Sequence, residues 1–90
     1  MTDVNVNAQD LRMLAAALRS FQQEVNQASK RVRGALQKAN WKDQRKVAFE
    51  LRLSDLQKQL DGFMTGEVDQ MVRTLTALAQ KVEEISKMRM

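Results

Sequence analysis

The feature that most constrains the fold is an apolar repeat that runs unbroken through the first half of the chain. Apolar and small residues recur at alternating steps of three and four, at Leu11, Leu14, Leu18, Phe21, Val25, Ala28, Val32, Ala35 and Ala39. Such steps follow one stripe of an α-helix and are typical of a coiled-coil seam. Asn7 can cap this helix, and Asp10 suits the dipole of its first turn. We therefore predict an extended lead-in over residues 1–7 and a helix over 8–39.

A second apolar stripe begins after a short interruption. Its members are Phe49, Leu53, Leu56, Leu60, Met64, Val68, Met71, Leu75, Leu78, Val82 and Ile85. Asn40 suits a helix end and Asp43 suits the next N-cap, which predicts a turn over 40–43 and a second helix over 44–88.

The second stripe contains an irregularity near its middle. Three consecutive steps of four between Leu56 and Val68 form a stutter, which unwinds a supercoil locally. Gly62 and Gly66 lie in the same stretch, where each costs about 1 kcal/mol of helix stability relative to Ala. We expect a kink or weak point at 62–66, with a break near Gly66 as the extreme case.

Composition supports a single all-α domain over residues 1–90. Proline and tyrosine are absent, there are three glycines, and helix-forming residues dominate. A β-sandwich or barrel needs turn clusters and β-branched or aromatic strands, which the sequence lacks. Cysteine is also absent, which excludes disulfides and thiolate metal sites.

Two long helices joined by a short turn form an antiparallel hairpin, and this architecture implies a partner. A two-helix layer buries too little apolar surface for independent stability at this length. We expect two hairpins to pair into a dimeric four-helix bundle, as a homodimer or with a paralogous hairpin. The alternative is a monomer folded back at 62–66 into three helices. The residues predicted to form the hairpin and dimer seam are Leu14, Leu18, Phe21, Val25, Phe49, Leu53, Leu56 and Leu60.

No constellation of residues points to catalysis. Histidine, the commonest general base and metal ligand, is absent. Ser29 and Lys30 are sequence neighbours and point to different faces of a helix, and the carboxylates are scattered as on a solvated surface. We predict a non-enzymatic protein without a cofactor or metal.

Basic residues concentrate around the predicted turn. Residues 30–52 contain eight basic residues and two acidic ones. A hairpin brings this stretch to one end, which makes nucleic acid or an anionic membrane an alternative partner. No nucleic-acid motif accompanies the charges, so we favour a protein-docking end. A third hypothesis is that the chain is a coiled-coil adaptor in a cytosolic complex.

Trp41 is the one residue that the helical pattern does not explain. A tryptophan at a turn either closes the end of a bundle or anchors a partner. We take the turn residues Trp41, Lys42, Asp43 and Arg45 as the candidate partner-binding site.

The arrangement resembles the WXG family, the ESAT-like small proteins of type VII secretion. The shared features are the lead-in Val4-Asn5-Val6, the helix opening Leu11-Arg12-Met13-Leu14, the turn Ala39-Asn40-Trp41, the segment Val47-Ala48-Phe49 and the long second helix. The resemblance implies helical hairpins that pair into four-helix bundles. It also implies that the chain serves as a substrate, carrier or partner of a larger secreted effector moved by a membrane ATPase.

Two family signatures are altered. Trp41-Lys42-Asp43 stands where the family has Trp-x-Gly, and a chain without tyrosine lacks the family's tyrosine-based export signal. No signal peptide or membrane-spanning stretch is visible. We therefore expect a cytoplasmic protein, exported, if at all, by a signal-peptide-independent, type VII-like route with a partner that supplies the signal.

Overall fold

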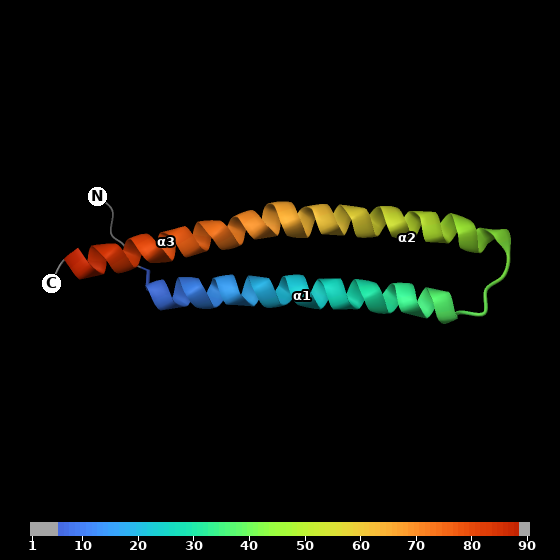
Figure 1. Cartoon of the computed structure of the whole chain (residues 1–90), viewed down its shortest axis with the longest axis horizontal. Coiled ribbons are helices and arrows are strands. Elements are labelled where there is room, and N and C mark those ends of the chain that lie inside the picture. The colour runs from blue at the N-terminus through green and yellow to red at the C-terminus, as the bar shows by residue number, and fades with distance from the viewer. Residues whose placement is uncertain (1–5, 89–90) are drawn as a thin grey trace.

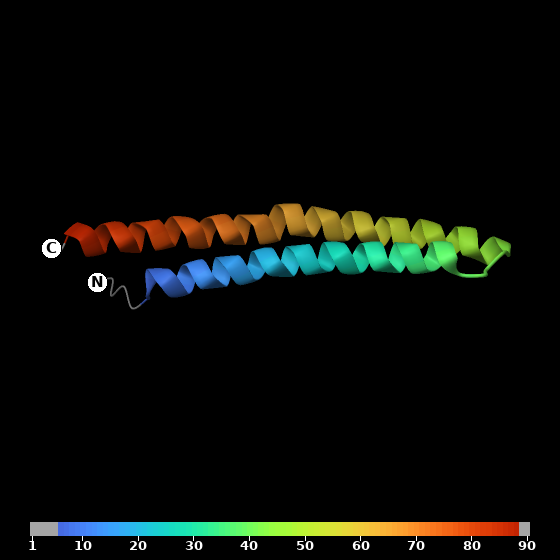
Figure 2. The same cartoon turned by 60° about the horizontal axis from the view of Figure 1, so that its bottom comes forward.

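The computed structural model describes residues 6–88, and every regular element in that range is helical. The elements are α1 (Ala8–Lys38), α2 (Gln44–Phe63), the π-helical turn η1 (Met64–Val68) and α3 (Asp69–Met88). Figure 1 shows α2, η1 and α3 as one continuous rod that runs antiparallel to α1, and Figure 2 shows the two rods side by side from another direction. The predicted all-α hairpin is confirmed, while most of the predicted lead-in over 1–7 lies outside the described residues.

Both long helices begin at side-chain caps. The Asn7 side chain accepts a hydrogen bond from the backbone N–H of Gln9 at 2.8 Å, and the Asp43 side chain accepts one from that of Arg45 at 2.9 Å. These bonds satisfy backbone donors that the first turn of a helix leaves without partners. The first helix ends at Lys38, one residue before the predicted end, because Ala39 is already extended.

The helix does not break near Gly66. The backbone N–H of Asp69 donates to the carbonyl of Met64, five residues earlier, which is the bonding pattern of a π-helix. The chain from Leu56 to Met71 holds one residue more than two heptads, and the π-helical turn absorbs that residue. The irregularity is thus a local π-turn in a continuous helix, and the chain does not fold back at 62–66 into three helices.

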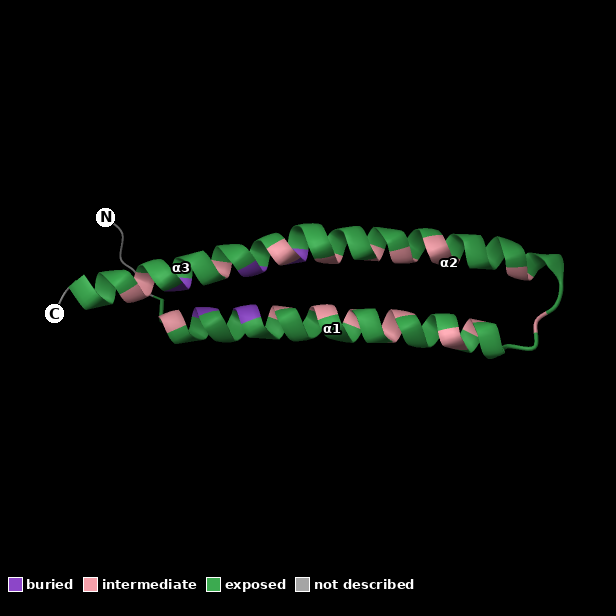
Figure 3. Ribbon diagram, viewed as in Figure 1, coloured by how far each residue is buried: buried purple, intermediate pink, exposed green. Residues whose placement is uncertain are grey.

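The hairpin packs tightly in one half and loosely in the other. The backbones of α1 and α3 approach closely, whereas α2 does not approach α1 to the same extent. Within residues 6–88, all five buried apolar residues lie in the closely packed half: Leu11, Ala15, Val68, Val72 and Ala79. Figure 3 shows this burial confined to the start of α1 and to the rod beyond the middle. The small side chains of Ala15 and Ala79 let the two backbones come together.

The molecule is a rod with little interior. It measures 69 × 20 × 14 Å, and its radius of gyration is 20.1 Å. A compact chain of the same length would have a radius of gyration of about 12 Å. No large side chain is fully buried among the described residues. A single copy therefore leaves most of its apolar side chains in contact with water.

Candidate protein-interaction surfaces

The turn residues converge on one carboxylate. Asp43 Oδ1 accepts hydrogen bonds from the backbone N–H of Arg45 at 2.9 Å and from Trp41 Nε1 at 2.8 Å. Asp43 Oδ2 lies 3.2 Å from Arg45 Nη2 in an exposed ion pair. Asp43 therefore caps α2 and ties down the indole at the same time. Three of the four predicted turn residues meet here, and Lys42 is exposed beside them.

The Trp41 ring packs against the second helix. Its ring centroid lies 5.6 Å from that of Phe49, with the ring planes tilted by 45°. Tilted contacts at such distances are favourable between aromatic rings. Trp41 is half-buried by this contact. The contact holds the indole against α2 at the turn end of the hairpin.

The predicted seam divides into an inner and an outer part. Its members Leu18, Val25, Leu53 and Leu60 are half-buried between the rods, whereas Leu14, Phe21, Phe49 and Leu56 are exposed. We call the residues of each rod that lie between the two rods its inner line. On α1 this line also contains Ala15, Gln22, Ser29 and Leu36, which are spaced seven residues apart. Sequence reasoning missed this line because two of its members are polar, although the seven-residue spacing was visible.

The two sides of the inner line differ in character. Arg12 and Arg19 each follow an inner residue by one position, whereas Leu14 and Phe21 each precede one. One position is about 100° of rotation, so the arginines and the exposed apolar residues flank the inner line on opposite sides.

The same order holds on the partner rod. Glu83 follows the inner residue Val82, while Met71 and Leu78 precede the inner residues Val72 and Ala79. Arg12 pairs with Glu83, which places the polar flanks of both rods on one face of the hairpin. The apolar flanks of both rods therefore share the opposite face.

We call that surface the apolar face. Its large residues are Leu14, Phe21, Phe49, Leu56, Phe63, Met71, Leu78 and Ile85. Each keeps between 40% and 52% of its surface exposed. On the second rod they recur every seven residues on both sides of η1, and the π-turn absorbs the extra residue between Phe63 and Met71. The π-turn thus keeps the second stripe on one face along the whole rod.

The opposite, polar face holds the charged contacts. Arg12 Nη2 lies 2.6 Å from Glu83 Oε1, and Arg19 Nη1 lies 2.5 Å from Asp69 Oδ1. The hydrogen bonds from Arg12 hold the pKa of the Glu83 carboxyl below its usual range, and those from Arg19 do the same for the pKa of Asp69. Both pairs are solvent-accessible, so they orient the rods more than they stabilise them.

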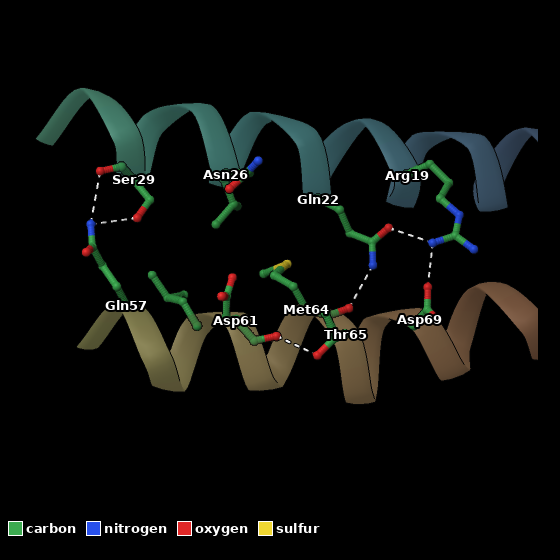
Figure 4. A pocket seen from close by; sticks show the side chains of 11 residues that line it. Arg19, Gln22, Asn26, Ser29, Gln57, Asp61, Met64, Thr65 and Asp69 are labelled. Atoms are coloured by element: carbon green, nitrogen blue, oxygen red, sulfur yellow. Dashed lines mark hydrogen bonds and ion pairs between the residues drawn. The ribbon is translucent and has the colours of Figure 1, made fainter. Parts of the chain in front are cut away.

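A shallow groove of about 400 Å³ opens beside the π-turn (Figure 4). Gln22 Nε2 donates to the Met64 carbonyl at 2.7 Å, and Gln57 Nε2 donates to the Ser29 carbonyl and hydroxyl at 3.0 and 2.8 Å. Polar side chains in an otherwise apolar seam fix the register of two helices. These contacts align the loosely packed half of the hairpin, where apolar packing is sparse.

Within residues 6–88 there is no group of three or more acidic side chains placed to hold a metal ion. None of the helices in this range is long and apolar enough to span a membrane.

Comparison with protein-family models, with curated proteins and with solved structures finds no match for this chain. The resemblance to the WXG family therefore rests on the few shared residues alone.

Proposed function

We propose that this chain is a non-enzymatic interaction module whose apolar face pairs with the same face of a second copy, giving a four-helix bundle. The observation that carries the proposal is the apolar face, to which both rods contribute and which holds eight large, half-exposed side chains. Monomeric proteins rarely expose apolar surface of this extent unless it serves an interaction.

The energetics favour association. Burying the exposed half of a large apolar side chain contributes about 1 kcal/mol. Two copies bring eight such side chains each. Their sum is comparable to, or larger than, the roughly 4–15 kcal/mol that association costs. A face made of two parallel stripes is also suited to a two-fold symmetric partner, because the same patch serves on both copies.

The pairing is tested by placing a charge on the apolar face. Leu78→Glu should weaken self-association by about 100-fold or more, because each copy would bury an unpaired carboxylate. Leu51→Glu is the matched control, since Leu51 is exposed on the outward side of α2. Light scattering of the two variants at equal concentration gives the readout. Equal masses for both variants would overturn this choice of face.

The WXG resemblance suggests a setting for the pairing. We propose that the chain, as a homodimer or with a paralogous hairpin, partners a larger effector in a type VII-like export route driven by a membrane ATPase. The supporting features are the Trp41 turn and the hairpin length. The altered tripeptide and the missing tyrosine imply that the partner supplies the export signal.

Export is tested by following the chain in the medium of cells with and without that ATPase. The proposal predicts ATPase-dependent release only when a partner with a complete signal is present. Release that does not depend on the ATPase, or retention in every condition, would contradict it.

A further inference from the structure

The turn end of the rod carries most of the positive charge of the molecule. We call residues 30–52 the tip. Figure 1 shows the turn within this stretch at the end of the rod opposite the start of α1 and the end of α3. The tip contains eight basic and two acidic residues, whereas the rest of the chain contains seven basic and nine acidic residues. All of the basic residues of the tip are exposed except Lys46, which is half-buried.

These cations are largely free of carboxylate partners. Among the residues that the structure describes, Arg45 is the one basic residue of the tip in an ion pair, and its partner is Asp43. Asp43 is also occupied by the indole of Trp41 and the start of α2. Within the tip, Glu50 is then the one carboxylate left for the seven basic residues other than Arg45. The tip is therefore a strongly cationic surface open to an anionic partner.

Exposed apolar side chains lie among these cations, away from the apolar face. Val47 and Leu51 are one helical turn apart on α2 and are 58% and 64% exposed. Val47 precedes Phe49 by two positions, and Leu51 precedes Leu53 by two positions. Two positions are about 200° of rotation, so Val47 points away from the apolar face and Leu51 away from α1. Pairing through the apolar face would leave both side chains in water.

We propose that the tip binds the surface of an anionic phospholipid bilayer, with its Lys and Arg side chains on the headgroups and Val47 and Leu51 in the interfacial layer. Clusters of four to eight Lys and Arg residues are attracted to anionic lipid, and apolar side chains beside them add interfacial burial.

Two observations favour a bilayer over nucleic acid. The Trp41 ring is held by Asp43 and Phe49, so it is not presented for stacking on a base. Exposed Val47 and Leu51 add nothing to contacts with phosphates, whereas a bilayer interface buries them. The lipid proposal therefore uses both the charges and the apolar pair.

The test is sedimentation of the full chain with vesicles of equimolar phosphatidylcholine and phosphatidylglycerol, compared with vesicles of phosphatidylcholine alone. We expect binding to the anionic vesicles only, and its loss in high salt. K30Q/K38Q/K42Q removes three charges from the tip and should lower the affinity about tenfold or more. The matched control R73Q/K81Q/K87Q removes three charges from α3 and should stay within about twofold of the parent chain.

A second variant separates the lipid from other polyanions. V47S/L51S keeps every charge and should weaken vesicle binding by several-fold, while leaving any weak binding to duplex DNA unchanged. Equal vesicle binding by the two charge variants would overturn the proposal. So would tighter binding to a DNA duplex than to the vesicles, or vesicle binding that V47S/L51S does not weaken. Circular dichroism of each variant checks that its helices are intact.

Discussion

At the scale of single residues, Asp43 shows how one side chain can organise a whole turn. Its carboxylate caps α2, accepts a hydrogen bond from the Trp41 indole and pairs with Arg45. The sequence predicted the cap, because Asp is a favoured N-cap residue. It did not predict the contact with Trp41, which depends on how the turn directs the indole back onto its own neighbour.

Replacing Asp43 separates these contributions. Asp43→Ala should lower the free energy of unfolding by about 1 kcal/mol, because the cap is lost together with the indole contact. Asp43→Asn keeps an oxygen for the N–H groups and loses the exposed ion pair alone, so it should stay close to the parent chain. Urea denaturation followed by circular dichroism measures both. Equal losses for the two variants would assign the effect to charge instead of capping.

The two ion pairs of the polar face predict how stability depends on pH. Hydrogen bonds and charge from Arg19 and Arg12 lower the pKa of Asp69 and of Glu83 in the folded state. A lowered pKa gives a contribution that is fully present above the unfolded pKa, near pH 4–4.5, and is lost as the pH falls through the folded pKa. We expect the urea midpoint to hold from pH 7 to about pH 5 and to fall below that.

The matched control for this prediction is R12Q/R19Q, which removes both partners. Its urea midpoint should fall less steeply with acid than that of the parent chain, because its carboxyls no longer have lowered pKa values. The same acid dependence in both proteins would contradict the assignment to these two pairs.

At the scale of elements, the π-turn η1 keeps the second rod in register with the first. Without it, one extra residue would rotate α3 by about 100° and turn Met71, Leu78 and Ile85 off the apolar face. The sequence located the irregularity, because the steps of four and the glycines mark it. It could not show how the irregularity is resolved, since a local π-turn, a kink and a break all fit the same spacing.

A single-residue deletion tests this role of the π-turn. Deleting Gly66 removes the extra residue, so the turn can become α-helical while both stripes stay aligned. Self-association and helix content should be retained. Deleting Ala77, inside regular α3, should instead rotate the end of the helix out of register and destabilise the protein by about 2 kcal/mol or more.

Both deletions are compared by thermal unfolding and by light scattering. If deletion of Gly66 were as damaging as deletion of Ala77, the π-turn would not be the element that preserves the register.

At the scale of the whole molecule, the hairpin has a polar face, an apolar face and a cationic tip. The sequence predicted the two rods, the turn and the charge of the tip, because helical periodicity and local composition carry that information. It treated eight residues as one seam, although Leu18 and Val25 face the partner rod and Leu14 and Phe21 face solvent. Periodicity alone cannot separate two adjacent stripes on one helix. The ion pairs between the rods show which side of each helix belongs to the polar face, and so which stripe belongs to the apolar face.

Pairing through the apolar face is tested by measuring the mass of the purified chain by sedimentation equilibrium at micromolar concentration. We expect a helical dimer of twice the 10.3 kDa chain mass. That dimer should dissociate in the Leu78→Glu variant and persist in Leu51→Glu. A stably helical monomer of 10.3 kDa across the concentration range would contradict pairing through the apolar face.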